Sequence, residues 1–279
     1  MATASPTASR NQSWFSTLCF RLFRKKHTNL STLYWTGQLG TEAIARLLTG
    51  KPATDLAVAH IPPAAFVATK IDDTVASLTI ALNERRGIER LHLLVISSAN
   101  LESYLQDSIR LHVANQGHHT EKPRKLTPVG DAIARPVVNR STIPAMLTFI
   151  EELLGIKFGI HLARWKDAYR LRCAAAHNGG VVTSEVRNLC PGQTIGDNIT
   201  LDWKRLWDYL ASADDIASLI DRTISTDSLR TLELLWFFQE MQQTKTLPAR
   251  KPAWSLAHKL GFTISRNGKR TINRKIFGE

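Results

Sequence analysis

The chain has few cysteines, no long apolar run and no acidic residue near its N-terminus. Its three cysteines, Cys19, Cys173 and Cys190, are too few and too scattered for a disulfide framework or a paired-cysteine metal clip. They suit a reducing compartment, so we expect a cytoplasmic protein with no metal and no cofactor. Proline, glycine and charged residues interrupt every apolar stretch, which argues against a membrane-spanning helix.

The composition is that of an ordinary globular protein. Of the 279 residues, 43% are hydrophobic and 22% are charged. This excludes a collagen, a wholly disordered chain and a small disulfide-knotted peptide. The length suits one or two domains.

Positive charge is concentrated at the two ends of the chain. Lys and Arg number 36 against 24 Asp and Glu, a formal net charge of +12. Residues 1–41 carry +5 with no acidic residue, residues 244–279 carry +8, and residues 42–243 carry −1. We therefore predict a basic N-terminal arm, a helical bundle and a basic C-terminal tail with these boundaries. Basic ends favour a polyanionic partner, most often nucleic acid, and added solubility is the alternative.

The N-terminal arm is also rich in Ser and Thr, as targeting segments are. Its segment 14–26 combines aromatic and basic residues, a composition that can lie on a membrane surface. The charges follow the apolar part instead of preceding it, so the layout is not that of a secretory signal. We expect a partly ordered arm without membrane contact, and keep membrane contact and organelle targeting as alternatives.

Apolar residues recur at helical spacing through most of the bundle. This periodicity predicts an all-α fold, with helices at 41–48, 64–86, 88–113, 144–154, 161–177, 202–224 and 229–241. Gly87 is expected to break the chain between two of them, and residues 114–143 to form a long loop. Gly155 is expected to end one helix and Asn178-Gly179-Gly180 another.

Two segments have the pattern of β-hairpins. Residues 192–201 lie in an otherwise irregular stretch and favour a short hairpin. In the C-terminal tail, Asn267-Gly268 stands between two β-prone runs, and this turn dipeptide predicts a small hairpin over 262–273.

The stretch 169–182, with the sequence YRLRCAAAHNGGVV, has the clearest chemical potential. Arg172 precedes His177 by five positions, which in a helix separates the two side chains by about 140° and about 7.5 Å. A two-fold partner packed on this helix end would bring two arginines and two histidines into one cleft. Arg binds phosphate with a forked pair of donors, and His can take and return a proton. RNA supplies its own 2′-hydroxyl nucleophile, so such a cleft needs no metal to cleave it.

The same stretch resembles the HEPN superfamily (higher eukaryotes and prokaryotes nucleotide-binding), whose signature is Arg-x4–6-His near a helix end. The likeness extends to SANLESYLQD at 98–107, to LLGI at 153–156 with Trp165-Lys166, and to GQTIGDNITL at 192–201. It covers about residues 88–224. The resemblance implies an α-helical bundle that is commonly a homodimer, and a metal-independent endoribonuclease of toxin–antitoxin or antiviral defence systems.

Carried onto this chain, the resemblance makes Arg172 and His177 the catalytic pair. Arg172 would stabilise the scissile phosphate, and His177 would transfer protons. Asn178 would hold the helix end or the imidazole. Apart from the resemblance, the charges of Arg170, Lys166 and Arg164 on or near the same helix suit them to follow an RNA backbone, and a merely solvated face is the alternative. The implied partners are RNA, a second copy of the chain, and an antitoxin or regulatory protein.

A non-catalytic RNA- or nucleotide-binding bundle is the alternative function. Many active members of the family have a polar residue directly after the motif arginine, and Cys173 stands at that position here. Our interpretation of Cys173 is a small core residue, and a redox-sensitive thiol at the site is the other choice.

Overall fold

The computed structural model describes residues 16–61, 73–116 and 142–279. These residues form helices and turns, with two isolated β-bridges and no β-strand among them. The predicted all-α class is thereby confirmed for the described part of the chain. Within that part, no helix combines the length and the apolar character needed to cross a membrane.

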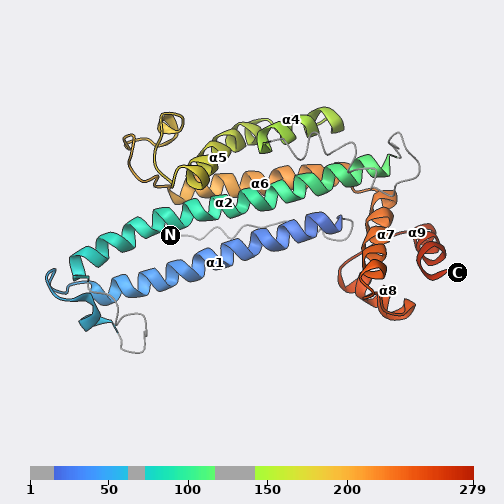
Figure 1. Cartoon of the computed structure of the whole chain (residues 1–279), viewed down its shortest axis with the longest axis horizontal. Helices are drawn as coiled ribbons and strands as arrows, with labels where there is room; N and C mark the ends of the chain where they lie inside the picture. The colour runs from blue at the N-terminus through green and yellow to red at the C-terminus, as the bar shows by residue number, and fades with distance from the viewer. Residues whose placement is uncertain (1–15, 62–72, 117–141) are drawn as a thin grey trace, which may run out of the picture. The chain divides into compact units, whose positions relative to one another are not determined.

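Eight α-helices are assigned in the described residues (Figure 1). They are α1 (Leu18–Leu48), α2 (Val75–Asn115), α4 (Ile143–Leu154), α5 (Ile160–His177), α6 (Trp203–Ile224), α7 (Asp227–Gln243), α8 (Arg250–Lys259) and α9 (Arg266–Ile272). A π-helical turn, Asn273–Phe277, continues α9, and short 3-10 turns lie at Ala57–His60 and Arg187–Leu189.

Several helix ends are fixed by the residues that the sequence pattern singled out. Thr142 caps α4 by accepting from the Ala145 backbone N–H at 3.3 Å, and Gly155 ends that helix with a φ of 66°. Asp202 precedes α6, and its carboxylate accepts from the Arg205 N–H at 2.9 Å. The predictions for 144–154, 161–177, 202–224 and 229–241 are confirmed to within a few residues.

The first two long helices differ from their predicted bounds. The helix expected at 41–48 begins at Leu18, so α1 runs through the boundary predicted between arm and bundle. The break expected at Gly87 is wrong, because α2 is continuous there. Instead, this glycine allows a close approach, since a Cβ at position 87 would lie 3.2 Å from the Thr200 methyl group. Parts of the expected 64–86 helix and 114–143 loop lie outside the described residues.

The chain divides into two compact units. Unit 1 holds residues 1–25, 100–162 and 213–279, and unit 2 holds residues 26–99 and 163–212. In unit 2, the ends of α1 and α2 enclose a small apolar core. Its buried members are Leu48, Ala57, Ile61, Val75, Leu78 and Leu82.

An aromatic cluster joins α1 to the first turns of α6 within unit 2. The rings of Tyr34 and Trp203 stack in parallel at 4.7 Å, and Trp35 and Trp207 pack edgewise or tilted against Trp203. Arg90 of α2 donates to the Tyr34 hydroxyl at 3.1 Å and to the Leu201 carbonyl at 3.3 Å. These contacts tie the segment that precedes α6 to the long helices.

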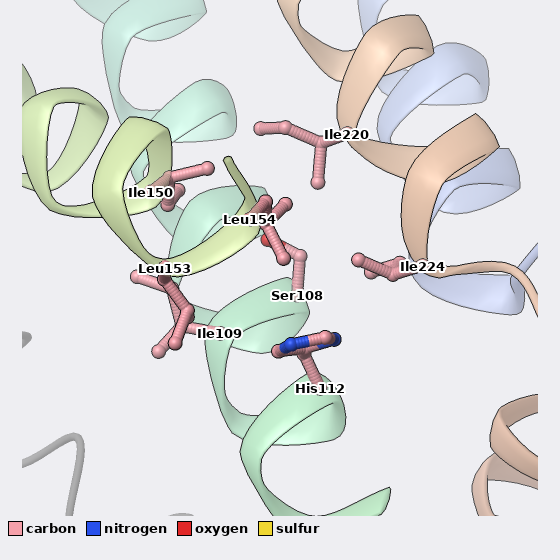
Figure 2. Close-up of a pocket in the computed structure, with 8 residues that line it drawn as sticks. All are labelled: Ser108, Ile109, His112, Ile150, Leu153, Leu154, Ile220 and Ile224. Carbon is pink, nitrogen blue, oxygen red and sulfur yellow. The ribbon is translucent and has the colours of Figure 1, made fainter. Parts of the chain in front are cut away.

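In unit 1, residues of α2, α4 and α6 pack around a crevice (Figure 2). It is lined by Ser108, Ile109, His112, Ile150, Leu153, Leu154, Ile220 and Ile224. The space is about 160 Å³ with its open mouth included. Small-molecule sites enclose about 300–1,000 Å³, so this crevice is a packing feature and not a candidate site.

Two buried carboxylates hold the start of α1 in unit 1. Asp221 accepts from the Thr17 backbone N–H at 3.1 Å and from its hydroxyl at 2.5 Å. Glu233 accepts from the backbone N–H groups of Leu18 and Cys19 at 2.6 and 2.8 Å. Four donors at one helix start are thus satisfied from α6 and α7, which explains why a helix begins here without a local acidic cap.

The hairpin predicted over 262–273 is wrong, because this segment forms α9. Ser265 caps that helix, its hydroxyl accepting from the Gly268 N–H at 3.1 Å. Gly268 has no positive φ, as the predicted turn would have required, and it is buried against Thr231 of α7. Ile272 and Ile276 are also buried in a shared core. Burial of residues 268, 272 and 276, which are four residues apart, therefore outweighs the turn preference of Asn267-Gly268.

The hairpin predicted over 192–201 does not form either. Residues 196–199 pair with the segment just after α5, through Gly196 N–H to Val182, Val182 N–H to Asp197 and Ile199 N–H to Gly180, at 2.8–2.9 Å. A single bridge, Val181 with Asn198, results. The segment thus braces the end of α5 instead of folding on itself.

Candidate functional site: the outward stripe of α5

One side of α5 anchors the helix in unit 2. Trp165, Ala168, Leu171 and Ala174, each three residues apart, are all buried. Because these four buried residues are apolar, this side of α5 packs inward and the opposite side faces outward. The rotational position of every other α5 side chain follows from this anchor.

The opposite side carries Lys166, Arg170, Cys173 and His177, which we call the α5 stripe. Their spacing of four, three and four residues places them within about 60° of one another around the helix. Lys166, Arg170 and His177 are exposed, and Cys173 is a half-buried free thiol. The stripe therefore offers two fixed cations, a thiol and an imidazole, and no carboxylate.

Arg172 does not share this face. It lies about 140° around the helix from His177, beside the buried side, and is half-buried. Its guanidinium carbon lies 5.9 Å from the centroid of the Tyr169 ring, within the range of a cation–π contact. Within one protomer, Lys166 and Arg170 therefore share a face of α5 with His177, and Arg172 lies outside that face.

His177 is placed by the way in which α5 ends. The backbone N–H groups of Asn178 and Gly180 both donate to the Ala174 carbonyl, at 3.0 and 3.1 Å. Gly179 and Gly180 have φ values of 65° and 77°, which side chains with a Cβ rarely adopt. The chain therefore turns away directly after the imidazole, and both His177 and Asn178 are exposed.

Hydrogen bonds set the charge and position of groups around the stripe. Arg170 donates to the Asn188 side-chain carbonyl at 3.2 Å, which ties the exposed guanidinium to the segment after α5. In the bracing segment, the Thr194 backbone N–H and hydroxyl both donate to Asp197, and these bonds lower the pKa of that carboxyl.

Sequence reasoning identified every charged member of the stripe but not their alignment. Cys173, interpreted as a small core residue, is half-buried. The contact between Arg170 and Asn188 was missed, because the loop that carries Asn188 has no periodic pattern. The alignment itself could have been found by applying the helical period to the polar residues as well as to the apolar ones.

The described residues contain no group of three or more His, Cys, Asp or Glu side chains arranged to hold a metal ion. The chain matches no family model, and it has no significant match among curated proteins or solved structures.

Proposed function

We propose that the chain is a HEPN-type, metal-independent endoribonuclease. The observation that carries the proposal is the position of His177, an exposed imidazole at the end of a cationic stripe. Phosphodiester binding needs fixed positive charge, and RNA cleavage needs a group that exchanges protons near neutral pH. The α5 stripe supplies both on one face.

In the proposed reaction, Lys166 and Arg170 bind backbone phosphates on one side of the cleavage point. A base removes the proton of the ribose 2′-hydroxyl, and the 2′-oxygen attacks the adjacent phosphorus. The bond from phosphorus to the 5′-oxygen breaks, and an acid protonates that oxygen. The products are a 2′,3′-cyclic phosphate and a 5′-hydroxyl, so neither water nor an oxidant is consumed.

A second copy of the chain completes the site. In an in-line displacement the attacking 2′-hydroxyl and the leaving 5′-oxygen lie on opposite sides of the phosphorus, so a second proton-transferring group is needed beside one imidazole. Arg172 also faces away from His177 within one helix. Two-fold pairing of the α5 ends would place Arg172 of one protomer near His177 of the other. A role in a toxin–antitoxin or antiviral defence system, with an antitoxin or regulatory partner, belongs to the same proposal through the sequence resemblance.

A non-catalytic RNA- or nucleotide-binding module is the second candidate. The position of Cys173 favours it, because a thiol lies on the stripe between Arg170 and His177 where a stronger hydrogen-bonding group would position a phosphate better. Such a module would bind RNA with salt-dependent affinity and leave it intact.

The products of cleavage distinguish the two functions. In EDTA, a single-stranded RNA is expected to yield fragments that end in a 2′,3′-cyclic phosphate. The same RNA with 2′-O-methyl groups throughout should remain intact, because it lacks the nucleophile. Cleavage of the methylated strand, a 5′-phosphate product or a requirement for magnesium would each contradict the proposed reaction, and intact RNA with retained binding would favour the second candidate.

A further inference from the structure

The last three α-helices form a module with its own apolar core. Leu234, Leu235 and Phe238 of α7 pack with buried residues of the two following helices and their connection. These are Ala253, Ala257, Phe262, Ile272 and Ile276. Figure 1 shows α8 and α9 beside α7. We call α7, α8 and α9 with the π-helical turn 273–277 the C-terminal module.

The helix α9 presents a cationic outer face. Its buried residues are Gly268 and Ile272, and the π-helical turn adds Ile276. Arg266 and Arg270, four residues apart, lie on the side of α9 opposite Gly268 and Ile272, with Asn267 and Lys269 on either side of them. All four are exposed. Residues 266–277 carry five positive charges and no acidic residue, namely Arg266, Lys269, Arg270, Arg274 and Lys275.

These charges have no structural role that the described residues reveal. None of the five forms an ion pair within that part of the chain. The acidic Glu279 is paired with Arg250 instead, and Asp227 accepts from the Ser265 backbone N–H at 2.7 Å. A dense cationic face left unneutralised in the fold is suited to a polyanion.

Contacts from α7 and α8 fix the position of α9 and of the π-helical turn that continues it. The Trp254 indole N–H donates to the Asn273 side chain at 3.0 Å, and Gln242 donates to the Ile276 carbonyl at 3.0 Å. On the α7 side, Gly268 packs so closely that a side chain there would meet the Thr231 hydroxyl. A partner therefore meets a preformed helix and need not order it on binding.

The shape of this face selects among polyanions. A helix with its side chains is about 10–12 Å across, and the major groove of B-form DNA is about 12 Å wide. The major groove of A-form RNA is too deep and narrow for side chains to read. Single strands are bound through aromatic stacking, and α9 contains no aromatic residue.

The connection between α8 and α9 adds a second geometric argument. Residues 260–265 join them, with Gly261 at a φ of 77°, and Ser265 caps the second helix. Helix-turn-helix units also join two helices by a turn that often contains glycine, and their second helix lies in the major groove. Their turn has three or four residues, and the connection here has six.

From these observations we infer that the C-terminal module binds double-stranded DNA, with α9 in the major groove. Arg266 and Arg270 face the groove, and Lys269 contacts the phosphates that line it. Asn267 and the two arginines are the side chains suited to reading adenine and guanine edges. This inference does not rest on the proposed ribonuclease activity, because none of its residues belongs to α5.

The test is fluorescence anisotropy with the full chain and a labelled 24-base-pair DNA of mixed sequence, in EDTA. Non-specific binding is expected with a Kd of about 10⁻⁶–10⁻⁴ M. The Arg266→Ala/Arg270→Ala variant should weaken it about tenfold or more, and Lys269→Ala, which removes a phosphate contact, should reduce the slope of log K against log salt by about 1. A matched variant, Lys51→Ala/Lys204→Ala, removes two exposed charges elsewhere and should stay within about twofold of the unmodified chain.

A duplex RNA of the same sequence and the DNA are both measured on a Lys166→Ala/Arg170→Ala/His177→Ala chain, which removes cleavage and RNA binding at the α5 stripe. The RNA should bind at least about tenfold more weakly than the DNA. Equal binding of both duplexes, or unchanged DNA affinity in the α9 variant, would overturn the inference. Because the DNA titration requires no cleavage, its failure leaves the ribonuclease proposal standing. Loss of RNA cleavage would likewise leave the DNA result unaffected.

Discussion

His177→Ala is expected to lower metal-free RNA cleavage by about 10²–10⁴-fold, the usual contribution of a positioned acid or base. The side chain is exposed and the substitution leaves the buried side of α5 intact, so the fold should be retained. The measurement is the single-turnover rate on a labelled RNA in EDTA. Arg172→Ala is expected to reduce the same rate, through loss of phosphate stabilisation.

The matched control is His258→Ala, which removes another exposed histidine at the end of a helix, in α8. Its cleavage rate should equal that of the unmodified chain. Arg170→Ala and Lys166→Ala should mainly raise KM, because these residues bind the RNA backbone without exchanging protons. Equal cleavage by the His177→Ala variant would place the chemistry elsewhere and refute the assignment.

The free energy of unfolding is expected to fall as pH rises from about 4 to about 7. Burial raises the pKa of Asp221 to about 6 and that of Glu233 to about 7, against 3.8 and 4.5 for unperturbed groups. Hydrogen bonds from Thr17 and the charges of Arg21 and Arg230 lower the pKa of Asp221, and hydrogen bonds from Leu18 and Cys19 and the charge of Arg21 lower that of Glu233. Neither set cancels the effect of burial. The folded chain therefore holds more protons than the unfolded chain in this window.

Linkage gives the direction and size of the effect. Stabilisation by protonated Asp221 and Glu233 is complete below about pH 4 and is lost as pH rises through their folded pKa values. Each contributes on the order of 3 kcal/mol across the window. Urea unfolding at pH 4.5, 6 and 7.5 measures this change, against the Asp221→Asn/Glu233→Gln variant, whose profile should be flatter by a few kcal/mol.

The control for this series is Glu185→Gln/Glu240→Gln, which removes two exposed carboxylates. It should follow the pH dependence of the unmodified chain. Parallel profiles for the buried-pair variant and the unmodified chain would show that Asp221 and Glu233 titrate in the folded state as they do in the unfolded state. The hydrogen bonds at the start of α1 would then lower the two pKa values by as much as burial raises them.

Much of the helical content could be predicted because it depends on local rules. Apolar spacing, Thr142, Gly155 and Asp202 set the limits of α4 and α6, and each of these signals acts within a few residues. The exposed end of α5 was predictable for the same reason, since Gly179 and Gly180 terminate a helix wherever it packs.

The errors arose where distant residues override local preference. Asn267-Gly268 favours a turn, but burial of Gly268 against Thr231 makes the segment helical. Gly87 favours a break, but α2 continues past it. The start of α1 was missed although Thr17 caps it locally by accepting from the Phe20 N–H at 3.2 Å. The carboxylates of Asp221 and Glu233, which satisfy its other first donors, lie more than 200 residues further along the chain. For the site, sequence spacing gave the angle between Arg172 and His177, but only the packing of α5 showed which of them shares a face with Lys166 and Arg170.

The most direct test of a composite Arg172/His177 site is a heterodimer of two inactive chains. Arg172→Ala and His177→Ala chains with different tags would be co-expressed, purified as a mixed dimer and assayed on RNA in EDTA. The account predicts that the mixed dimer is at least about tenfold more active than either homodimer, because one intact arginine and one intact histidine meet across the two-fold axis. A mixed dimer as inactive as both homodimers would contradict it.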